Sequence, residues 1–512
     1  MNLTKPLIPP LLALTVLAAC GQTAPVVNTE TAKGVFQKNA LNPLTLVQLP
    51  IPNTPREAVS ERGVISVPVN RSSSSTQTID VEFFRFKRLP EANPDTPPIF
   101  LLRGGPGYPG LGDAVENEAF YKRNIQRYTR LSDLIIVGQR GFGTSGDLSC
   151  PAAPVSSLEE VNTMTQSQAR YRRTSEVCRD KYLDKGVDLS GYNIKEMAAD
   201  VADIASSLGY KQIQLKGNSF GSFWGIAVLR HHADLVKRAT FSALEGPDHT
   251  FDRPSAVKAA FTNLAEAAAN SERYADRIPD EGLIAAYQSV IDKANSIPVA
   301  TSFVSKENGD TINLSIDGDG FRRFFYGVTT LPVFRYTMSD WPDDLLNIIE
   351  GDLSDMAPRL YQYMTGTNAD NAAEEIIECS SGISPGRREE IDQDSSRDYV
   401  SPPALFDKQT CAIWGEAIID MDRSEFKTPV PTVLIQGTWD ISTPYEDAKT
   451  VQTLFSNHRF ITVHGGSHGA IFESEEADPE FSDALDHWYV TGEQDLLPQN
   501  IRLPTMNWNG GE

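Results

Sequence analysis

The sequence has little positive charge, few cysteines and only one long apolar run. Its 46 Lys and Arg residues are outnumbered by 68 Asp and Glu residues, so the formal net charge is -22 and the pI about 4.8. Proteins that bind nucleic acids need basic surfaces for the phosphate backbone, so this charge argues against nucleic acid as a partner. The composition, 40% hydrophobic and 22% charged, is that of a globular protein and excludes wholesale disorder.

The one long apolar run lies near the start of the chain, from Leu7 to Ala19. A membrane-spanning helix needs about 20 apolar residues, so the run is too short to span a bilayer and is typical of a secretory signal peptide. It ends in Leu17-Ala-Ala-Cys-Gly21, which resembles the lipobox of bacterial lipoproteins. We therefore expect residues 1–19 to be a lipoprotein signal peptide and Cys20 to carry the lipid. A plain signal peptide with an incidental Cys20 is the alternative.

A flexible tether is expected to follow over residues 20–45, because this stretch is rich in Thr, Asn, Ala and Val. No later segment is apolar for long enough to cross a membrane, so the rest of the chain should be a soluble body attached to a membrane by acyl chains. The expected location is the bacterial cell envelope, at the outer membrane or the cell surface.

Five cysteines are an odd number, and lipidation of Cys20 would leave four. An exported protein reaches a compartment where disulfides persist, so the remaining cysteines are expected to pair. Three pairings are possible, and we favour the two that are local in sequence, Cys150–Cys178 and Cys379–Cys411. Four buried thiols are the alternative.

Short apolar runs typical of buried strands recur along the chain and alternate with helical segments. This alternation predicts a mostly parallel sheet covered by helices on both faces. Two β-rich runs, Gly63 to Asn70 and Ile79 to Lys87, predict an antiparallel pair before it. The other predicted strands are residues 99–102, 134–137, 213–215, 239–243, 432–435 and 460–463.

The alternation stops near residue 251, and Ala-rich helical stretches follow to about residue 428. We interpret residues 251–428 as a helical cap inserted into a core made of residues 46–250 and 429–512. A cap at this point would lie over the carboxyl ends of the strands, where ligands bind in open α/β sheets.

The run Gly217-Asn-Ser-Phe-Gly221 fits the pattern G-x-S-x-G, with a strand-like run before it and a helical run after it. A serine on such a sharp strand-to-helix turn presents its Oγ above the helix N-terminus, where positive potential favours a developing anion. The pattern often occurs by chance, but its flanking strand and helix predict Ser219 as a nucleophile. A purely structural turn is the alternative.

A serine nucleophile needs a base, and the base needs a carboxylate to orient it. Asp440 directly follows one late predicted strand, and His468 follows the next one, 28 residues later. In α/β-hydrolases the acid and the histidine follow late strands in this order, so we predict a triad of Ser219, Asp440 and His468. His464 is the alternative base and Asp447 the alternative acid. The glycines between the two histidines argue against a metal site.

A glycine-rich loop, Gly104-Gly-Pro-Gly107, follows the predicted strand 99–102. The oxyanion of an acyl-transfer reaction needs two N–H donors, one from the residue after the nucleophile and one from a loop after an early strand. We therefore expect Phe220 and this loop to supply the two donors.

Two motifs connect the chain with a family. Arg103-Gly-Gly-Pro-Gly107 resembles the His-Gly-Gly-Pro-Gly motif of the prolyl-aminopeptidase family of serine peptidases, with Arg103 in place of the histidine. Gln139-Arg-Gly-Phe-Gly-Thr-Ser145 resembles the family segment Asp-Gln-Arg-Gly-x-Gly-x-Ser, with Gly138 in place of the aspartate. The chain looks most similar to the secreted tripeptidyl aminopeptidase branch, which has an N-terminal hairpin, a cap and a cysteine before the last strands.

The resemblance implies an α/β-hydrolase fold with an inserted helical cap. It also implies that Ser219, Asp440 and His468 are the triad and that Gly105 and Phe220 form the oxyanion hole. The implied activity is the release of residues or short peptides, proline-type or tripeptidyl, from peptide N-termini, with neither a cofactor nor a metal.

An exopeptidase needs a wall that measures its substrate, often with a carboxylate for the substrate's ammonium group. Glu245 follows the predicted strand 239–243 and is our candidate for that role, with an exposed loop acid as the alternative. Two other functions stay open: a carboxylesterase or lipase that uses the same triad, and a surface binding protein that has kept the fold and lost catalysis. The sequence leaves oligomeric state open.

Overall fold

The structure is a computed structural model that describes residues 44–48, 60–108, 110–151, 155, 157–326, 334–366, 369–400 and 408–508. The predicted signal peptide, Cys20 and the predicted tether up to residue 43 lie outside these residues. Within the described ranges, no helix combines the length and the apolar character needed to cross a membrane.

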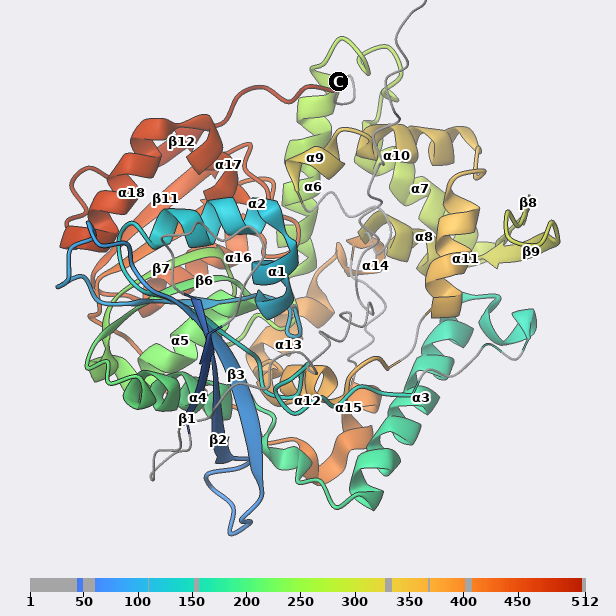
Figure 1. The fold of residues 1–512 in the computed structure, drawn as a ribbon. Helices are drawn as coiled ribbons and strands as arrows, with labels where there is room; N and C mark the ends of the chain where they lie inside the picture. Colours follow the sequence, from blue (N-terminus) through green and yellow to red (C-terminus); the bar gives the residue numbers. More distant parts are fainter. Residues whose placement is uncertain are drawn as a thin grey trace, which may run out of the picture.

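A single large sheet runs through the molecule in the order β1-β2-β3-β5-β4-β6-β7-β10-β11-β12 (Figure 1). All neighbours from β5 to β12 are parallel, whereas β1, β2 and β3 pair antiparallel with each other and β3 pairs antiparallel with β5. The sheet is that of an α/β-hydrolase, so the predicted fold class is confirmed. Its strands are β1 (Leu44–Gln48), β2 (Ser60–Pro68), β3 (Thr78–Phe86), β4 (Ile99–Leu102), β5 (Leu134–Val137), β6 (Ile213–Ser219), β7 (Val236–Leu244), β10 (Thr432–Gly437), β11 (His458–His464) and β12 (Asn500–Arg502).

Helices cover both faces of this sheet, which is why its central strands are apolar throughout. Every residue of β4, β5 and β10 is buried. The helices that contribute to the two packed faces are α1 (Gly110–Glu116), α2 (Glu118–Phe120), α17 (Ala470–Ala477) and α18 (Pro479–Thr491) on one side, and α4 (Ile194–Ser207), α5 (Phe220–His232) and α16 (Tyr445–Val451) on the other.

Helix α4 illustrates how the sequence sets these elements. Asn193 caps its start by accepting a hydrogen bond from the N–H of Glu196. Met197, Val201 and Ile204 recur at helical spacing and are fully buried against the sheet. Gly209, just past the end, adopts the positive φ of 77° expected of a C-terminal glycine.

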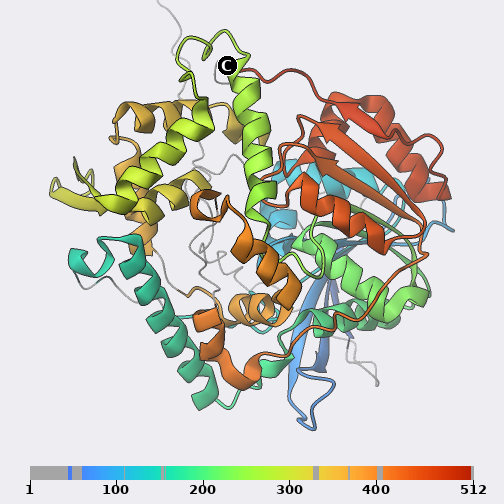
Figure 2. The ribbon, with the colours of Figure 1, turned by 180° about the vertical axis from the view of Figure 1, so that it is seen from behind.

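The segment between β7 and β10 forms a layer beside the sheet (Figures 1 and 2). It differs from the predicted helical cap in containing an antiparallel hairpin of two strands. The elements of this layer, which we call the cap, are α6 (Pro254–Ala269), α7 (Leu283–Ser296), β8 (Val299–Val304), β9 (Thr311–Ile316), α8 (Gly318–Tyr326), α9 (Arg335–Met338), α10 (Trp341–Glu350), α11 (Met356–Gly366), α12 (Ala372–Ser381), α13 (Pro385–Gln393), α14 (Arg397–Val400) and α15 (Lys408–Trp414).

A helix from the first half of the chain also belongs to the cap. Helix α3 (Met164–Asp184) packs against α11, α12 and α15, so the predicted cap boundaries of 251–428 leave it out. Single helical turns complete the described elements: η2 (Tyr121–Gln126), η3 (Leu158–Val161), η4 (Leu189–Gly191), η5 (Ala233–Leu235), η6 (Gly415–Ala417) and η7 (Gln452–Leu454).

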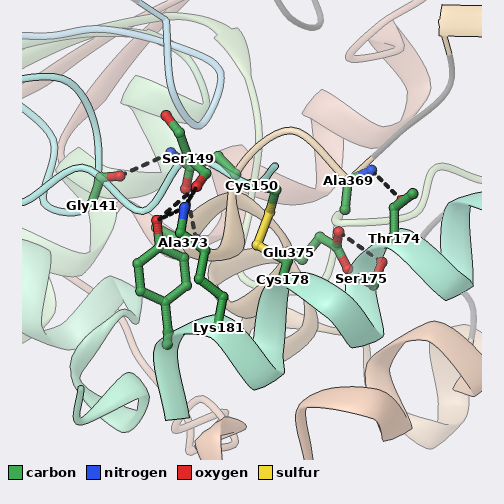
Figure 3. Close-up of a disulfide and its surroundings, with 12 residues drawn as sticks. Gly141, Ser149, Cys150, Thr174, Ser175, Cys178, Lys181, Ala369, Ala373 and Glu375 are labelled. Atoms are coloured by element: carbon green, nitrogen blue, oxygen red, sulfur yellow. Dashed lines mark hydrogen bonds between the residues drawn. A yellow bond between two sulfur atoms is a disulfide. The ribbon is translucent and has the colours of Figure 1, made fainter. Parts of the chain in front are cut away.

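Both predicted disulfides are present. Cys150–Cys178 joins the loop after β5 to α3, and Cys379–Cys411 joins α12 to α15 (Figure 3 shows the first). The linked residues are 28 and 32 positions apart, and loops of that length are worth roughly 3 to 4 kcal/mol each in the chain-entropy model. The first bridge therefore fixes α3 to the loop after β5, and the second fixes α12 to α15.

Glu375 lies between the same three helices and is 1% exposed. Its carboxyl group accepts hydrogen bonds from Ser175 Oγ on α3 at 3.0 Å and from Trp414 Nε1 on α15 at 2.9 Å (Figure 3 shows the first). Burial raises the pKa of Glu375 to about 7, and it raises the pKa values of Glu374 and Glu378 on the same helix to about 8. The folded protein therefore keeps protons on α12 that the unfolded chain releases near pH 4.5.

We predict that the cap loses stability as the pH rises. Carboxyl groups whose pKa is raised on folding stabilise the fold fully below about pH 4.5, and this contribution is lost as the pH passes 7 to 8. Glu375→Gln keeps a neutral group in place and should gain about 1 to 3 kcal/mol over the natural protein at pH 8, with little change at pH 5.

Urea unfolding at the two pH values measures this difference. Glu416→Gln, which changes an exposed acid just beyond α15, is the matched control and should change nothing. A Glu375→Gln variant that is no more stable than the natural protein at pH 8 contradicts the prediction.

Candidate active site

Ser219 lies at the carboxyl end of β6, immediately before α5. Its backbone has φ 59° and ψ -134°, a conformation that residues with a Cβ rarely adopt. Glycines on both sides are required, because a Cβ on Gly217 would lie 2.2 Å from Gly221 O, and one on Gly221 would lie 2.1 Å from Leu102 O. The turn therefore has the sharp, strained backbone of a nucleophile elbow.

Ser222 connects this elbow to the end of β7 through hydrogen bonds. Its buried hydroxyl donates to Ser219 O at 2.7 Å and accepts from the N–H of Glu245 at 2.9 Å. Sequence reasoning missed Ser222, although a small hydroxyl residue one turn after Ser219 was a usable signal.

Asp440 follows β10 and His468 follows β11, so both lie at the same edge of the sheet as Ser219. His468 Nδ1 is 3.0 Å from each carboxyl oxygen of Asp440. Asp440 is fully buried, and such a group is stable only when hydrogen-bonded. Its other donors are the N–H groups of Ser442 and Thr443, the Thr443 hydroxyl and Gln436 Nε2.

The alternative base and acid lie elsewhere. His464 Nε2 is 3.0 Å from Asn500 Oδ1 at the edge of the sheet. Asp447 lies on α16, where it accepts from Arg387 Nη2 and Arg253 Nε at 2.6 Å each. Asp447 therefore joins the core to the cap, and only His468 is paired with a carboxylate beside the elbow.

The glycine-rich loop passes directly over Ser219. A Cβ on Gly104 would lie 3.2 Å from Ser219 Cβ and 3.6 Å from its Oγ, so glycine permits this close approach. Gly105 has φ 113°, and within the described part of the chain its N–H donates to no backbone acceptor. Phe220 is the first residue of α5, so its N–H has no acceptor within the helix.

In this structure the Ser219 hydroxyl makes no hydrogen bond to another described residue. Contacts between a nucleophile and its base are often long in unliganded sites and tighten when substrate binds. Among the described residues, no group of three His, Cys, Asp or Glu side chains is placed to hold a metal ion.

The chain is similar to known proteins in part of its sequence, along most of its length, and in its fold. Residues 398–495 match a family model described as TAP-like protein. The tripeptidyl aminopeptidase of Streptomyces lividans is 21% identical over 467 residues, which are 85% of this chain and 82% of that protein. That of Streptomyces coelicolor is also 21% identical, over 85% of this chain and 81% of its own length. Among solved structures, an esterase from Exiguobacterium antarcticum covers 81% of this chain and 97% of its own, with 14% identity and a TM-score of 0.35.

The chain has the fold of an α/β-hydrolase, and its residues 398–495 are similar to the TAP-like protein family. The geometry explains both motif positions at which this chain departs from the prolyl-aminopeptidase pattern. At Gly138, a Cβ would lie 2.6 Å from Glu82 O and 2.8 Å from Ser145 Oγ, so an aspartate has no room there. The Gly138 N–H donates to Glu82 O at 2.8 Å and continues the sheet contact beyond β5.

The other departure, Arg103, holds the start of the glycine-rich loop. Its Nη2 is 2.7 Å from Asp113 Oδ2 on α1. Its guanidinium also lies over the rings of Tyr108 and Phe120, at 4.4 and 4.7 Å from their centroids. Arg103 therefore joins the loop to α1 and α2 through charge and aromatic stacking together.

Glu245 lies in a group of three acids beside the elbow. It follows Leu244, which pairs with Ser219 across β6 and β7. Burial, together with the charges of Glu378 and Asp252, raises the pKa of Glu245 well above its ordinary value. Burial likewise raises the pKa of Asp252 and brings that of Glu378 to about 8, yet all three side chains keep partial solvent exposure. A cation bound among them would offset both the cost of burying ionised carboxyl groups and the repulsion between their charges.

The cap also touches the loop that carries His468. The Phe334 ring packs edge-on against the His468 ring, with centroids 6.2 Å apart. Arg335 donates from Nη1 to Gly465 O at 2.7 Å and from Nη2 to Pro504 O at 2.6 Å. Sequence reasoning missed these contacts, because their partners lie more than a hundred residues away along the chain.

We predict that Asp447→Asn lowers the free energy of unfolding and leaves the catalytic rate almost unchanged. Removing one partner of a buried ion pair leaves Arg387 without its counter-charge, which should cost about 3 to 5 kcal/mol of unfolding free energy. Urea unfolding measures that loss, and turnover per folded molecule should stay within about twofold. The opposite outcome, lost turnover at unchanged stability, would make Asp447 the catalytic acid in place of Asp440.

Proposed function

We propose that this hydrolase is a serine aminopeptidase that releases N-terminal residues or short peptides, proline-type or tripeptidyl, from peptides. In this proposal Ser219 is the nucleophile, His468 the base and Asp440 the residue that orients His468. The observation that carries the proposal is the 3.0 Å contact between His468 Nδ1 and Asp440 at the same sheet edge as the strained Ser219.

The proposed reaction runs through an acyl-enzyme. Ser219 Oγ attacks the scissile carbonyl carbon while His468 Nε2 takes its proton, and the N–H groups of Gly105 and Phe220 bind the resulting oxyanion. The C–N bond then breaks, and His468 gives its proton to the departing amine. A water molecule, deprotonated by His468, attacks the Ser219 ester; the bond to Ser219 Oγ then breaks, His468 returns the proton to Oγ, and the N-terminal fragment leaves. Asp440 stabilises the imidazolium that forms in each half of the reaction.

An aminopeptidase must also recognise a free ammonium group, and we assign that role to Glu245 with Asp252 and Glu378. Their raised pKa values mean that a bound cation would displace protons from the group. The similarity to tripeptidyl aminopeptidases along most of the chain supports a peptide substrate.

A panel of chromogenic substrates tests this function. Tripeptidyl anilides with free N-termini should be cleaved, whereas their N-acetylated versions and simple acyl esters should be poor substrates. Glu245→Gln should raise KM for the free-amine anilides about tenfold, because a charge-assisted hydrogen bond is lost. KM in the natural protein should fall as the pH rises from 5 to about 7, since the carboxyl groups ionise while the substrate's amino group, whose ordinary pKa is about 7.7 to 8.0, keeps its proton.

Ser219→Ala is the companion variant. It should abolish turnover and fluorophosphonate labelling while far-UV circular dichroism stays unchanged. Labelling that persists would refute the assignment of Ser219. Cleavage of esters alone would favour the carboxylesterase function, and a natural protein inert to both substrates and label would favour a binding protein.

We also propose that Cys20 carries a lipid that anchors the protein in the cell envelope, because residues 17–21 resemble a lipobox. Expression in a bacterial host fed an alkyne fatty acid should label the natural chain and leave Cys20→Ser unlabelled. The variant should also move from the membrane fraction to the soluble fraction. Equal labelling of both proteins would contradict the anchor.

A further inference from the structure

We propose that Gln139 is a positioning residue for the oxyanion loop and that Arg140 holds Gln139 in place. This inference rests on the proposed function, because it takes the N–H of Gly105 as one of the two oxyanion donors. It concerns how this chain keeps that donor in position, because a glycine-rich loop is too flexible to hold it without contacts from other residues.

The Gln139 carboxamide is bonded to the loop on both sides of Gly105. Its Nε2 donates to Arg103 O at 3.1 Å and to Gly104 O at 2.9 Å, and its Oε1 accepts from the N–H of Gly107 at 2.6 Å. The residue is only 5% exposed, so these bonds face little competition from water. One planar group therefore holds the peptide unit that leads into Gly105 and the one that follows Pro106.

The loop needs such an external support because of its composition. Gly105 and Gly107 have positive φ values of 113° and 93°, and glycine has more conformational freedom to lose than any other residue. An oxyanion donor must lie about 2.7 to 3.1 Å from the developing charge. A misplacement of about 1 Å is enough to slow a reaction about 100-fold.

Arg140 supplies the fixed point from which Gln139 reaches the loop. Its side chain is fully buried, and its Nε and Nη2 donate to the two carboxyl oxygens of Asp200 on α4 at 2.7 Å each. Its Nη1 donates to Gly191 O at 2.7 Å and Val69 O at 2.5 Å. Arg140 is thus held by α4, by η4 and by the loop after β2, so the neighbouring Gln139 side chain reaches Gly104 and Gly107 from a fixed position.

The test replaces Gln139 with groups of similar length. Gln139→Glu substitutes a carboxylate for the amide that donates to two carbonyl oxygens, and Gln139→Met removes all three hydrogen bonds without adding charge. Both variants should lower kcat for a tripeptidyl anilide about 10- to 100-fold, with KM within about threefold of the natural value. Ser219 active-site titration with a fluorophosphonate counts the folded enzyme in each sample.

Gln214→Glu is the matched control. Gln214 is also a fully buried glutamine that donates to a backbone carbonyl, Pro97 O at 2.8 Å, but it lies at the amino end of β6, away from the loop. The same chemical change there should lower the thermal unfolding temperature and leave kcat per titrated site within about twofold.

The inference is overturned if the Gln139 variants lose no more kcat than Gln214→Glu, or if their loss lies entirely in KM. It can be separated from the proposed function, because a natural enzyme that cleaves only esters allows the same kcat comparison with the ester. A natural protein that cleaves neither substrate refutes both.

Discussion

The backbone at the carboxyl end of β6 passes so close to its neighbours that no side chain fits between them. Gly217 lies against Gly221 O, and Gly221 lies against Leu102 O at the end of β4. This contact lets α5 begin directly after the strand and leaves Ser219 at positive φ, a strain of order 1 to 3 kcal/mol. Pairing of β6 with β4 and β7 holds the strained turn. The loop over Ser219, the Asp440–His468 pair and the nearby acids are all arranged around that turn.

Burial determines how much of the fold can be predicted from the sequence. Strands β4 and β5 have the predicted bounds, because helices cover both faces and every residue is apolar. Strand β12 has only three residues, β8 alternates between half-buried and exposed positions, and only two of the six residues of β9 are buried, so none of the three produces a strong apolar run. The position of α3 in the cap could not be predicted, because its partners lie far along the chain.

Some residues of the candidate site can likewise be predicted from the sequence, and others cannot. Ser219 ends a strand, and Asp440 and His468 each follow one, so a short local pattern is enough to predict these candidates. The contacts of Gln139 and Asp447 depend on which distant groups meet after folding. With 46 basic and 68 acidic residues, one sequence does not reveal that Asp447 faces Arg387. Such pairs are set by the packing of the cap on the sheet rather than by local pattern.

The two disulfides have a simple order along the chain. Cys150 pairs with the next cysteine, Cys178, and Cys379 pairs with the next one, Cys411. In a chain that emerges from a membrane pore amino end first and whose Cys20 already carries the proposed lipid, an oxidant that joins each new thiol to the previous free one would form both native bonds in turn. Neither bond would then need reshuffling by thiol–disulfide exchange. An oxidase alone, without an isomerase, could therefore complete both bonds, the one between α3 and the loop after β5 and the one between α12 and α15.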